Sequence, residues 1–151
     1  MILEKYLHQI ESYIPSHAEK NAEVSKVNVA WQLDHSLNVL IQVTEALRQS
    51  DPKEYKSTFN LAYEVLNFLH WIPRGKGKAP KTVLPDGEIT EESIRQKLAV
   101  AKEKLSLLTD LDEKSFFPHP YFGHIKKKRA IRFLGMHTKH HLKIVKDVLR
   151  G

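Results

Sequence analysis

The stretch FLGMHTKHHLKIVKDVL, residues 133–149, decides the fold because its apolar residues recur with the period of an α-helix. With His137 as origin and about 100° per residue, one side of this helix is apolar except for histidines. Within roughly 80° of His137 lie Ala130, Phe133, Leu134, His141, Ile144, Val145 and Val148. The opposite side carries Lys128, Arg132, Lys139, Lys143, Lys146 and Arg150. The pattern predicts an amphipathic helix over residues 126–150 with a basic, solvent-facing side.

Comparable periodicity predicts four more helices, over residues 2–14, 27–49, 53–71 and 90–108. Pro15 and the pair Asp51-Pro52 are stop signals, and Thr90 is a good N-cap. No segment alternates like a strand, and residues 109–123, TDLDEKSFFPHPYFG, read as a loop. We therefore expect an all-α fold: a four-helix bundle with an additional short helix or long connecting loops. One domain is expected to span residues 1–151.

Composition narrows the function classes. The chain has no cysteine, which excludes disulfides, thiolate metal ligands and a cysteine nucleophile, and which fits a cytoplasmic protein. There is no signal-peptide pattern and no apolar run long enough to cross a membrane. The net charge of +6 makes anionic partners plausible, including nucleic acid. Basic residues concentrate in PRGKGKAPK (73–81) and KKKR (126–129).

His137 and His141 lie at the centre of the apolar side of the last helix, four residues apart and on adjacent turns. A buried imidazole without a partner costs roughly 1–3 kcal/mol. A divalent metal would remove that cost, because it binds neutral imidazole and accepts an i, i+4 histidine pair. The alternative is two core histidines, each bonded to a carbonyl or a carboxylate.

A third ligand should come from another helix, and the pattern leaves two candidates level. His70 aligns with apolar residues of the third predicted helix. His35 lies roughly opposite the main apolar stripe of the second helix, but Trp31 and Val39 share its side. Trp31, one turn before His35, is a candidate wall of the pocket or a simple packing residue. Asp34 faces another direction and reads as a solvated residue rather than a general base.

The pattern W-x-x-x-H at 31–35, followed by H-x-x-x-H at 137–141, resembles the DinB/YfiT-like superfamily of metalloenzymes. HPYFG (119–123) with HTKHH (137–141), and PRGKGKAP (73–80), resemble one uncharacterised subfamily. The resemblance implies a four-helix bundle with a metal between helices, bound by His35, His137 and His141. It leaves His140 as a neighbour behind the ligands. One departure is HIKKKR (124–129), where we expect Thr or an acidic residue to open the last helix.

The family includes proteins similar in fold to bacterial S-transferases and isomerases that use low-molecular-weight thiols. The resemblance thus implies a metal-dependent transferase or hydrolase that uses metal-bound thiolate or hydroxide. Zinc is the default ion, and nickel, cobalt or iron would also suit imidazole. The expected substrate is a small molecule, either anionic or a thiol.

No catalytic residue can be assigned from the sequence. His119 is a candidate pocket residue, although turn geometry and packing also explain it. A different class of function, a basic module that binds nucleic acid or another anion without catalysis, is the alternative. Homodimerisation through an exposed helix face is compatible with either.

Overall fold

The computed structural model describes residues 2–69, 81–85 and 87–151, and it is mostly helical with a small two-stranded sheet. The α-helices are α1 Ile2–Tyr13, α2 Val29–Gln49, α3 Leu61–Leu69, α4 Glu91–Ser106 and α5 Lys127–Arg150. The strands are β1 Phe116–His119 and β2 Gly123–Lys126. Single 3-10 turns cover Ile14–Ser16, Pro52–Glu54, Lys81–Val83 and Leu107–Asp110. His70 and residues 73–80 of the basic segment lie outside the described residues.

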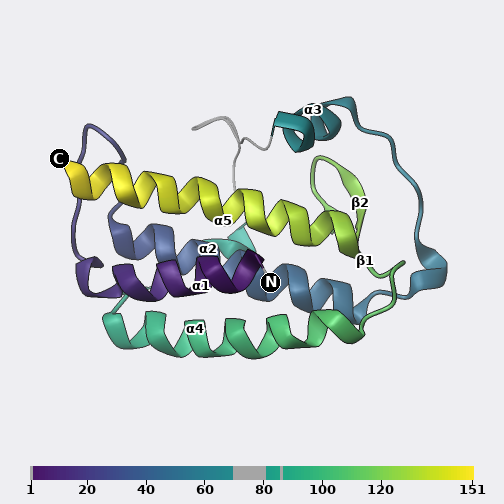
Figure 1. Cartoon of the computed structure of the whole chain (residues 1–151), viewed down its shortest axis with the longest axis horizontal. Coiled ribbons are helices and arrows are strands. Elements are labelled where there is room, and N and C mark those ends of the chain that lie inside the picture. Colours follow the sequence, from purple (N-terminus) through teal and green to yellow (C-terminus); the bar gives the residue numbers. More distant parts are fainter. Residues whose placement is uncertain (1, 70–80, 86) are drawn as a thin grey trace.

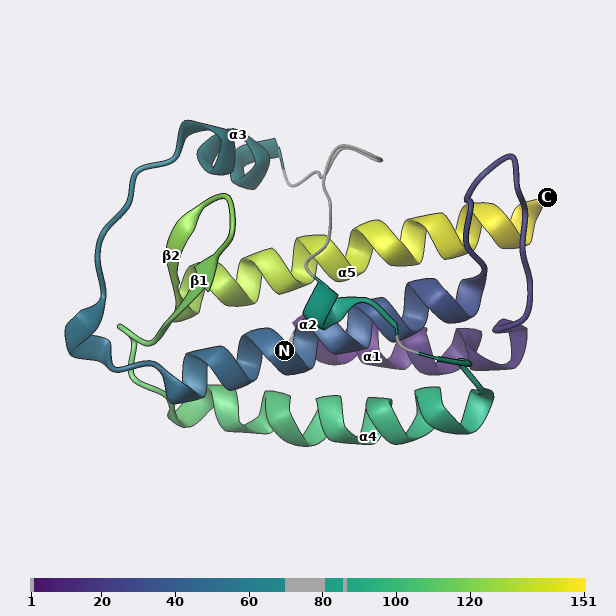
Figure 2. The same ribbon diagram turned by 180° about the vertical axis from the view of Figure 1, so that it is seen from behind.

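The long helices α1, α2, α4 and α5 run side by side (Figures 1 and 2). α2 and α1 each pack against both α4 and α5. The apolar side chains that meet between them are fully buried and include Leu3, Ile10, Leu33, Leu37, Ile94 and Leu134. The prediction of a helical protein is therefore confirmed, and burial of these stripes is the main stabilising contribution.

Local capping fixes two of the helix starts. The Asn28 side chain accepts a hydrogen bond from the Trp31 backbone N–H at the start of α2. Thr90 and Ser93 form a reciprocal capping box at the start of α4. These caps satisfy backbone donors that have no partner within the helix. Both starts lie within two residues of the sequence prediction.

The helix predicted over 53–71 is wrong in its first half, because the described α3 begins only at Leu61. The preceding residues are held to the hairpin instead. The Lys56 backbone N–H donates to His124 Nδ1 at 3.1 Å, and the Asn60 amide donates to the Tyr121 carbonyl at 2.9 Å. These contacts join residues more than 60 positions apart, so helical periodicity in the segment does not decide its conformation.

The expected loop at 109–123 is wrong in part, because β1 and β2 form an antiparallel hairpin, so the fold is mostly rather than entirely helical. Phe116 pairs with Lys126, and His119 pairs with Gly123. Gly123 has a φ of +72°, and a Cβ at that position would lie 2.6 Å from Thr58 Oγ1. Only glycine satisfies both the left-handed backbone and this close approach.

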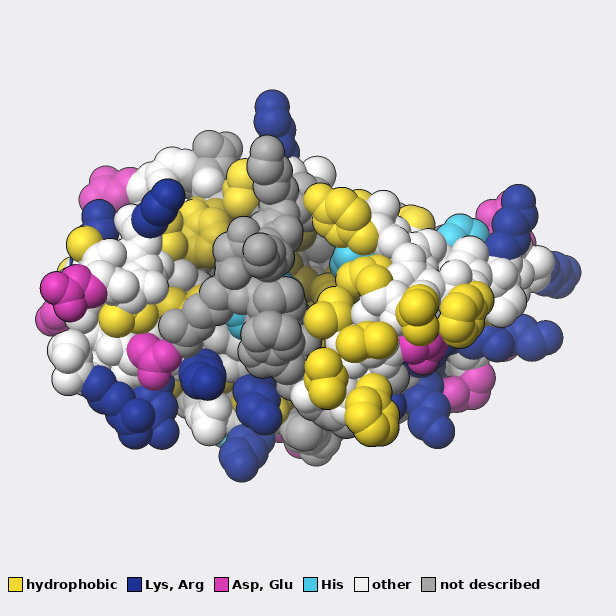
Figure 3. Space-filling view, turned by 90° about the horizontal axis from the view of Figure 1, so that it is seen from above, with side chains coloured by type: hydrophobic (Ala, Val, Ile, Leu, Met, Phe, Trp, Pro, Cys, Tyr) yellow, Lys and Arg dark blue, Asp and Glu magenta, His cyan; other side chains and the backbone are white. Residues whose placement is uncertain are grey.

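Exposed apolar side chains lie on α3 and just before it. Figure 3 shows hydrophobic side chains gathered on this face of the molecule. Its exposed members are Phe59, Leu61, Val65, Phe68 and Leu69. The expected homodimer would have an apolar surface available here, and it stays a prediction. No α-helix in the described part of the chain is long and apolar enough to span a bilayer.

Candidate metal centre

Three histidines converge between α2 and α5. His35 comes from α2, and His137 and His141 come from adjacent turns of α5. Each offers one ring nitrogen, and the three nitrogens lie within 4.8 Å of one another. The ring centroids are 4.5–5.1 Å apart, and the Nε2 atoms of His137 and His141 are separated by 3.2 Å. This group could hold a metal ion.

Hydrogen bonds on the far side of two rings fix their tautomers. His35 Nδ1 lies 2.8 Å from the Val83 carbonyl, and His141 Nδ1 lies 2.6 Å from Gln32 Oε1. Both partners are acceptors, so each Nδ1 carries the proton and donates it. The remaining nitrogen, Nε2, keeps its lone pair. Partners of this kind also orient the histidine ligands of metal ions.

Gln32 is itself held in place. Its Nε2 donates to Ser25 Oγ at 3.2 Å, which turns Oε1 toward His141. Gln32 is buried at 3% exposure, although it is a polar residue. Two successive hydrogen bonds, from Gln32 to Ser25 and from His141 to Gln32, therefore link the loop before α2 to a ring on α5. They fix the rotation of the His141 ring.

His137 has a different environment. Its Nδ1 is buried and has no hydrogen-bond partner among the described residues. Without an ion, the His137 Nε2–H must donate to His141 Nε2, because two facing lone pairs at 3.2 Å would repel. With an ion, both Nε2 lone pairs would point at it. Two nitrogens at about 2.05 Å from a tetrahedral ion lie about 3.3 Å apart, so the spacing fits a metal.

Burial disfavours the charged form of all three rings. Burial lowers the pKa of His35, and the bond to Val83 only partly opposes this. Burial also lowers the pKa of His137 and of His141 well below the ordinary value, and each neighbouring imidazolium would lower it further. Neutral imidazole is the form that binds a metal, so these lowered pKa values favour metal binding.

The other candidate residues line the site without joining the group. The Trp31 ring stacks on His35, with centroids 4.9 Å apart and planes 23° apart. The His140 ring meets His141 edge-on at 5.1 Å. His119 lies on β1 and packs on Phe133 at 5.2 Å, and Phe133 in turn lies 5.8 Å from His137. Trp31 therefore walls one side, and His119 stands behind an aromatic ring.

Asp34 differs from its sequence interpretation, because it is buried rather than solvated, at 3% exposure. It accepts hydrogen bonds from Lys97 Nζ at 2.5 Å and from Asn38 Nδ2 at 2.9 Å. α2 is covered on this side by α4, which supplies the lysine. Both carboxylate oxygens are thus engaged away from the three histidines.

The sequence did not reveal two partners of the centre, Gln32 and Val83. Gln32 lies three residues before His35, and a glutamine among the buried residues of a helix is the signal that could have found it. Val83 contributes only its backbone carbonyl from 48 residues away, so its residue type carries no signal.

Comparisons with models of protein families, with curated proteins and with solved structures found no match for this chain. The resemblance to the DinB/YfiT-like superfamily therefore stays a prediction, and the geometry of the three histidines stands on its own.

Proposed function

We propose that this chain is a divalent-metal-dependent enzyme that transfers small thiols, with His35, His137 and His141 as the metal ligands. We further propose that its four long helices are a single-domain bundle of the DinB type. The observation that carries the proposal is the convergence of three imidazoles between α2 and α5, with nitrogens within 4.8 Å. Burial, tautomers and spacing all suit a cation better than three separate core histidines.

Zinc is the ion that we propose. Three neutral nitrogen ligands and no thiolate suit a catalytic zinc site, which keeps at least one position open. No carboxylate belongs to the group within the described residues. Nickel, cobalt and iron remain compatible with imidazole ligands. When bound, such an ion acts as a Lewis acid that lowers the pKa of a water or thiol ligand.

The protein's own residues would hold and shape this site. The Val83 carbonyl and Gln32 Oε1 keep the Nδ1 protons of His35 and His141 in place, so that the Nε2 lone pairs face inward. Trp31 stacks on one face of His35 and covers it. This pre-organisation lowers the cost of ordering the ligands when the ion binds.

A thiol substrate fits the site better than water does. A bound ion lowers the pKa of water to about 7, and metal-dependent hydrolases with an H-E-x-x-H helix add a carboxylate as general base. Asp34, the carboxylate next to His35 in the sequence, is engaged with Lys97 and Asn38. A thiol has a pKa near 8.5 and needs much less help to lose its proton. The hydrolase is thus the second candidate, and a hydrolase that uses a carboxylate base would need one other than Asp34.

Cobalt substitution tests the proposal directly, because the chain contains no cysteine. Any thiolate-to-cobalt charge-transfer band must then come from an added thiol. We expect glutathione or cysteine to produce this band in the cobalt protein and not in a His137→Ala variant. An unchanged spectrum at millimolar thiol, with cobalt still bound, would contradict thiol transfer. It would leave the metal site itself standing and favour the hydrolase.

A further inference from the structure

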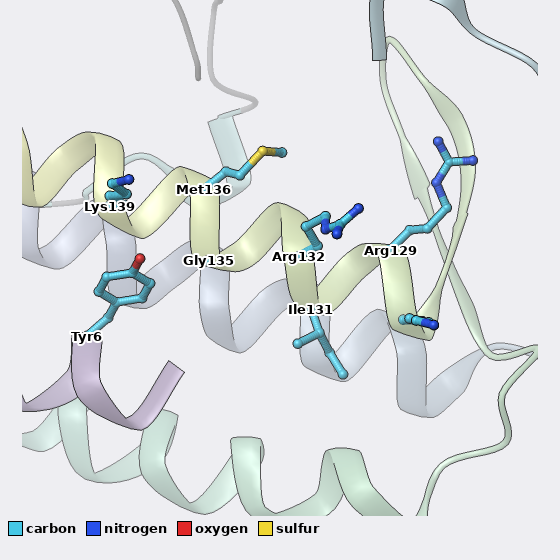
Figure 4. A pocket seen from close by; sticks show the side chains of 8 residues that line it. Tyr6, Arg129, Ile131, Arg132, Gly135, Met136 and Lys139 are labelled. Atoms are coloured by element: carbon cyan, nitrogen blue, oxygen red, sulfur yellow. The ribbon is translucent and has the colours of Figure 1, made fainter. Parts of the chain in front are cut away.

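A second candidate site lies on the opposite face of α5 from the histidines. It is a groove of about 610 Å³ between the first turns of α1 and the first half of α5 (Figure 4). Half of the residues that line it are basic and none is acidic. Its volume falls within the range of small-molecule sites, which is about 300–1,000 Å³.

Three of the four cations that line the groove lie in one straight row. Lys128, Arg132, Gly135 and Lys139 are spaced by four, three and four residues, so they lie along one line of the helix surface. The row is about 16 Å long, from eleven steps of about 1.5 Å. Gly135 has no side chain and leaves a gap in this row between Arg132 and Lys139. Figure 4 shows Arg132 and Lys139 on either side of Gly135, with Tyr6 opposite.

The three cations of this row differ from Arg129 in their lack of an acidic partner among the described residues. Arg129, at the edge of the groove, is bonded to Glu64 and lies over the Tyr63 ring at 4.5 Å. Within the described residues, no carboxylate pairs with Lys128, Arg132 or Lys139. Like charges one turn apart repel, and positive charge near a helix N-terminus also opposes the helix dipole. An anion in the groove would relieve both.

The groove also offers apolar contact. The Tyr6 ring from α1 and the Met136 side chain line it beside the cations. A row of lysines that is simply exposed to solvent would have no apolar side chains of this kind beside it. The combination of separated cations with an aromatic and a thioether surface matches a ligand that has both phosphate groups and an apolar or aromatic part.

We propose that this groove binds a phosphate-bearing organic ligand, with Arg132 and Lys139 holding phosphate oxygens and Tyr6 contacting the organic part. A nucleotide and a single strand of nucleic acid share this chemistry, because both join phosphate groups to aromatic bases. This proposal does not rest on the metal centre, because the two sites lie on opposite faces of α5.

The test is binding of ATP and of a twelve-nucleotide oligothymidylate, each at low salt, by calorimetry and by fluorescence anisotropy. The double variant R132Q/K139Q should bind either ligand about tenfold more weakly or worse, because charge-assisted hydrogen bonds are lost. The matched control is K143Q/K146Q, which removes the same charge from exposed positions of α5 outside the groove.

Tighter binding of ATP would assign the groove to a small organic phosphate, and tighter binding of the oligonucleotide would assign it to nucleic acid. The proposal is overturned if neither ligand binds the wild type, or if the control variant weakens binding as much as R132Q/K139Q does. Metal content, measured on the same samples, should be equal in all three proteins.

Discussion

The two faces of α5 differ in the kind of charge that they can accept. On the inner face, His137 and His141 are neutral, and each has a ring nitrogen within 4.8 Å of a ring nitrogen of His35. On the outer face, Lys128, Arg132 and Lys139 have no carboxylate partner within the described residues. The inner face suits a cation and the outer face an anion. The helical period separates these roles, because His137 and Lys139 are two residues apart and project about 160° from one another around α5.

Replacement of one inner histidine should have the largest effect. His137→Gln removes a ligand nitrogen, so zinc affinity should fall by more than about 100-fold, beyond the usual cost of losing an outer partner. Isothermal titration with zinc measures this. His140→Gln is the matched control, since His140 lies outside the group. Equal loss in both variants would break the contrast between the ligands and their neighbour.

Loss of the outer partner Gln32 should have a smaller effect on the same property. Gln32→Leu leaves the His141 Nδ1–H without its acceptor at 2.6 Å, so zinc affinity should fall about 10- to 100-fold. Gln32→Glu keeps an acceptor and should retain most of the affinity. The same titration compares the two variants. If Leu and Glu behaved alike, the bond to His141 would not contribute to metal binding.

Acid should lower the stability that His119 contributes where it packs on Phe122 and Phe133. Burial lowers the pKa of His119 from 6.5 to about 4, so the unfolded chain takes up its proton first as the pH falls. Stability from this residue is complete above about pH 6.5 and is lost progressively toward about pH 4. We expect a loss on the order of 1 kcal/mol at about pH 5, allowing for partial exposure.

Urea unfolding of the metal-free protein at about pH 7.5 and about pH 5 measures this loss. His119→Phe keeps a ring against Phe122 and Phe133 and should show a shallower decline. A decline of the same size in both proteins would assign the acid sensitivity to other groups.

Substitutions on the outer face should have the smallest effect on stability. R132Q/K139Q should change the free energy of unfolding by no more than about 0.5 kcal/mol, because both side chains are exposed and only like-charge repulsion is removed. Thermal unfolding checks this. A large destabilisation would mean that the groove is part of the folding core, and it would remove the contrast between the two faces.

The sequence predicted the long helices well because their ends and stripes are local properties. Thr90, Asn28 and Pro15 act within a few residues, and the apolar side of α5 follows from its own periodicity. The hairpin was missed because each strand has only four residues and β1 contains Pro118. Its pairing and the extended course of residues 55–60 depend on contacts between distant segments.

The candidate site was predictable in part. The pair His137 and His141 follows from the pattern of α5, whereas periodicity leaves His35 level with His70 and only the family resemblance favours His35. Periodicity could not decide, because α2 is covered by α4, α5 and β1 and thus has more than one buried side. The burial of Asp34 has the same cause, since its partner Lys97 lies on α4.

The most direct test is the zinc content of the wild-type chain, purified without a metal-affinity column and dialysed to equilibrium against dilute zinc. We predict one zinc per chain, lost when His35, His137 and His141 are all replaced by alanine. A wild-type chain that binds no zinc, or a triple variant that binds as much as the wild type, would contradict a metal centre between α2 and α5.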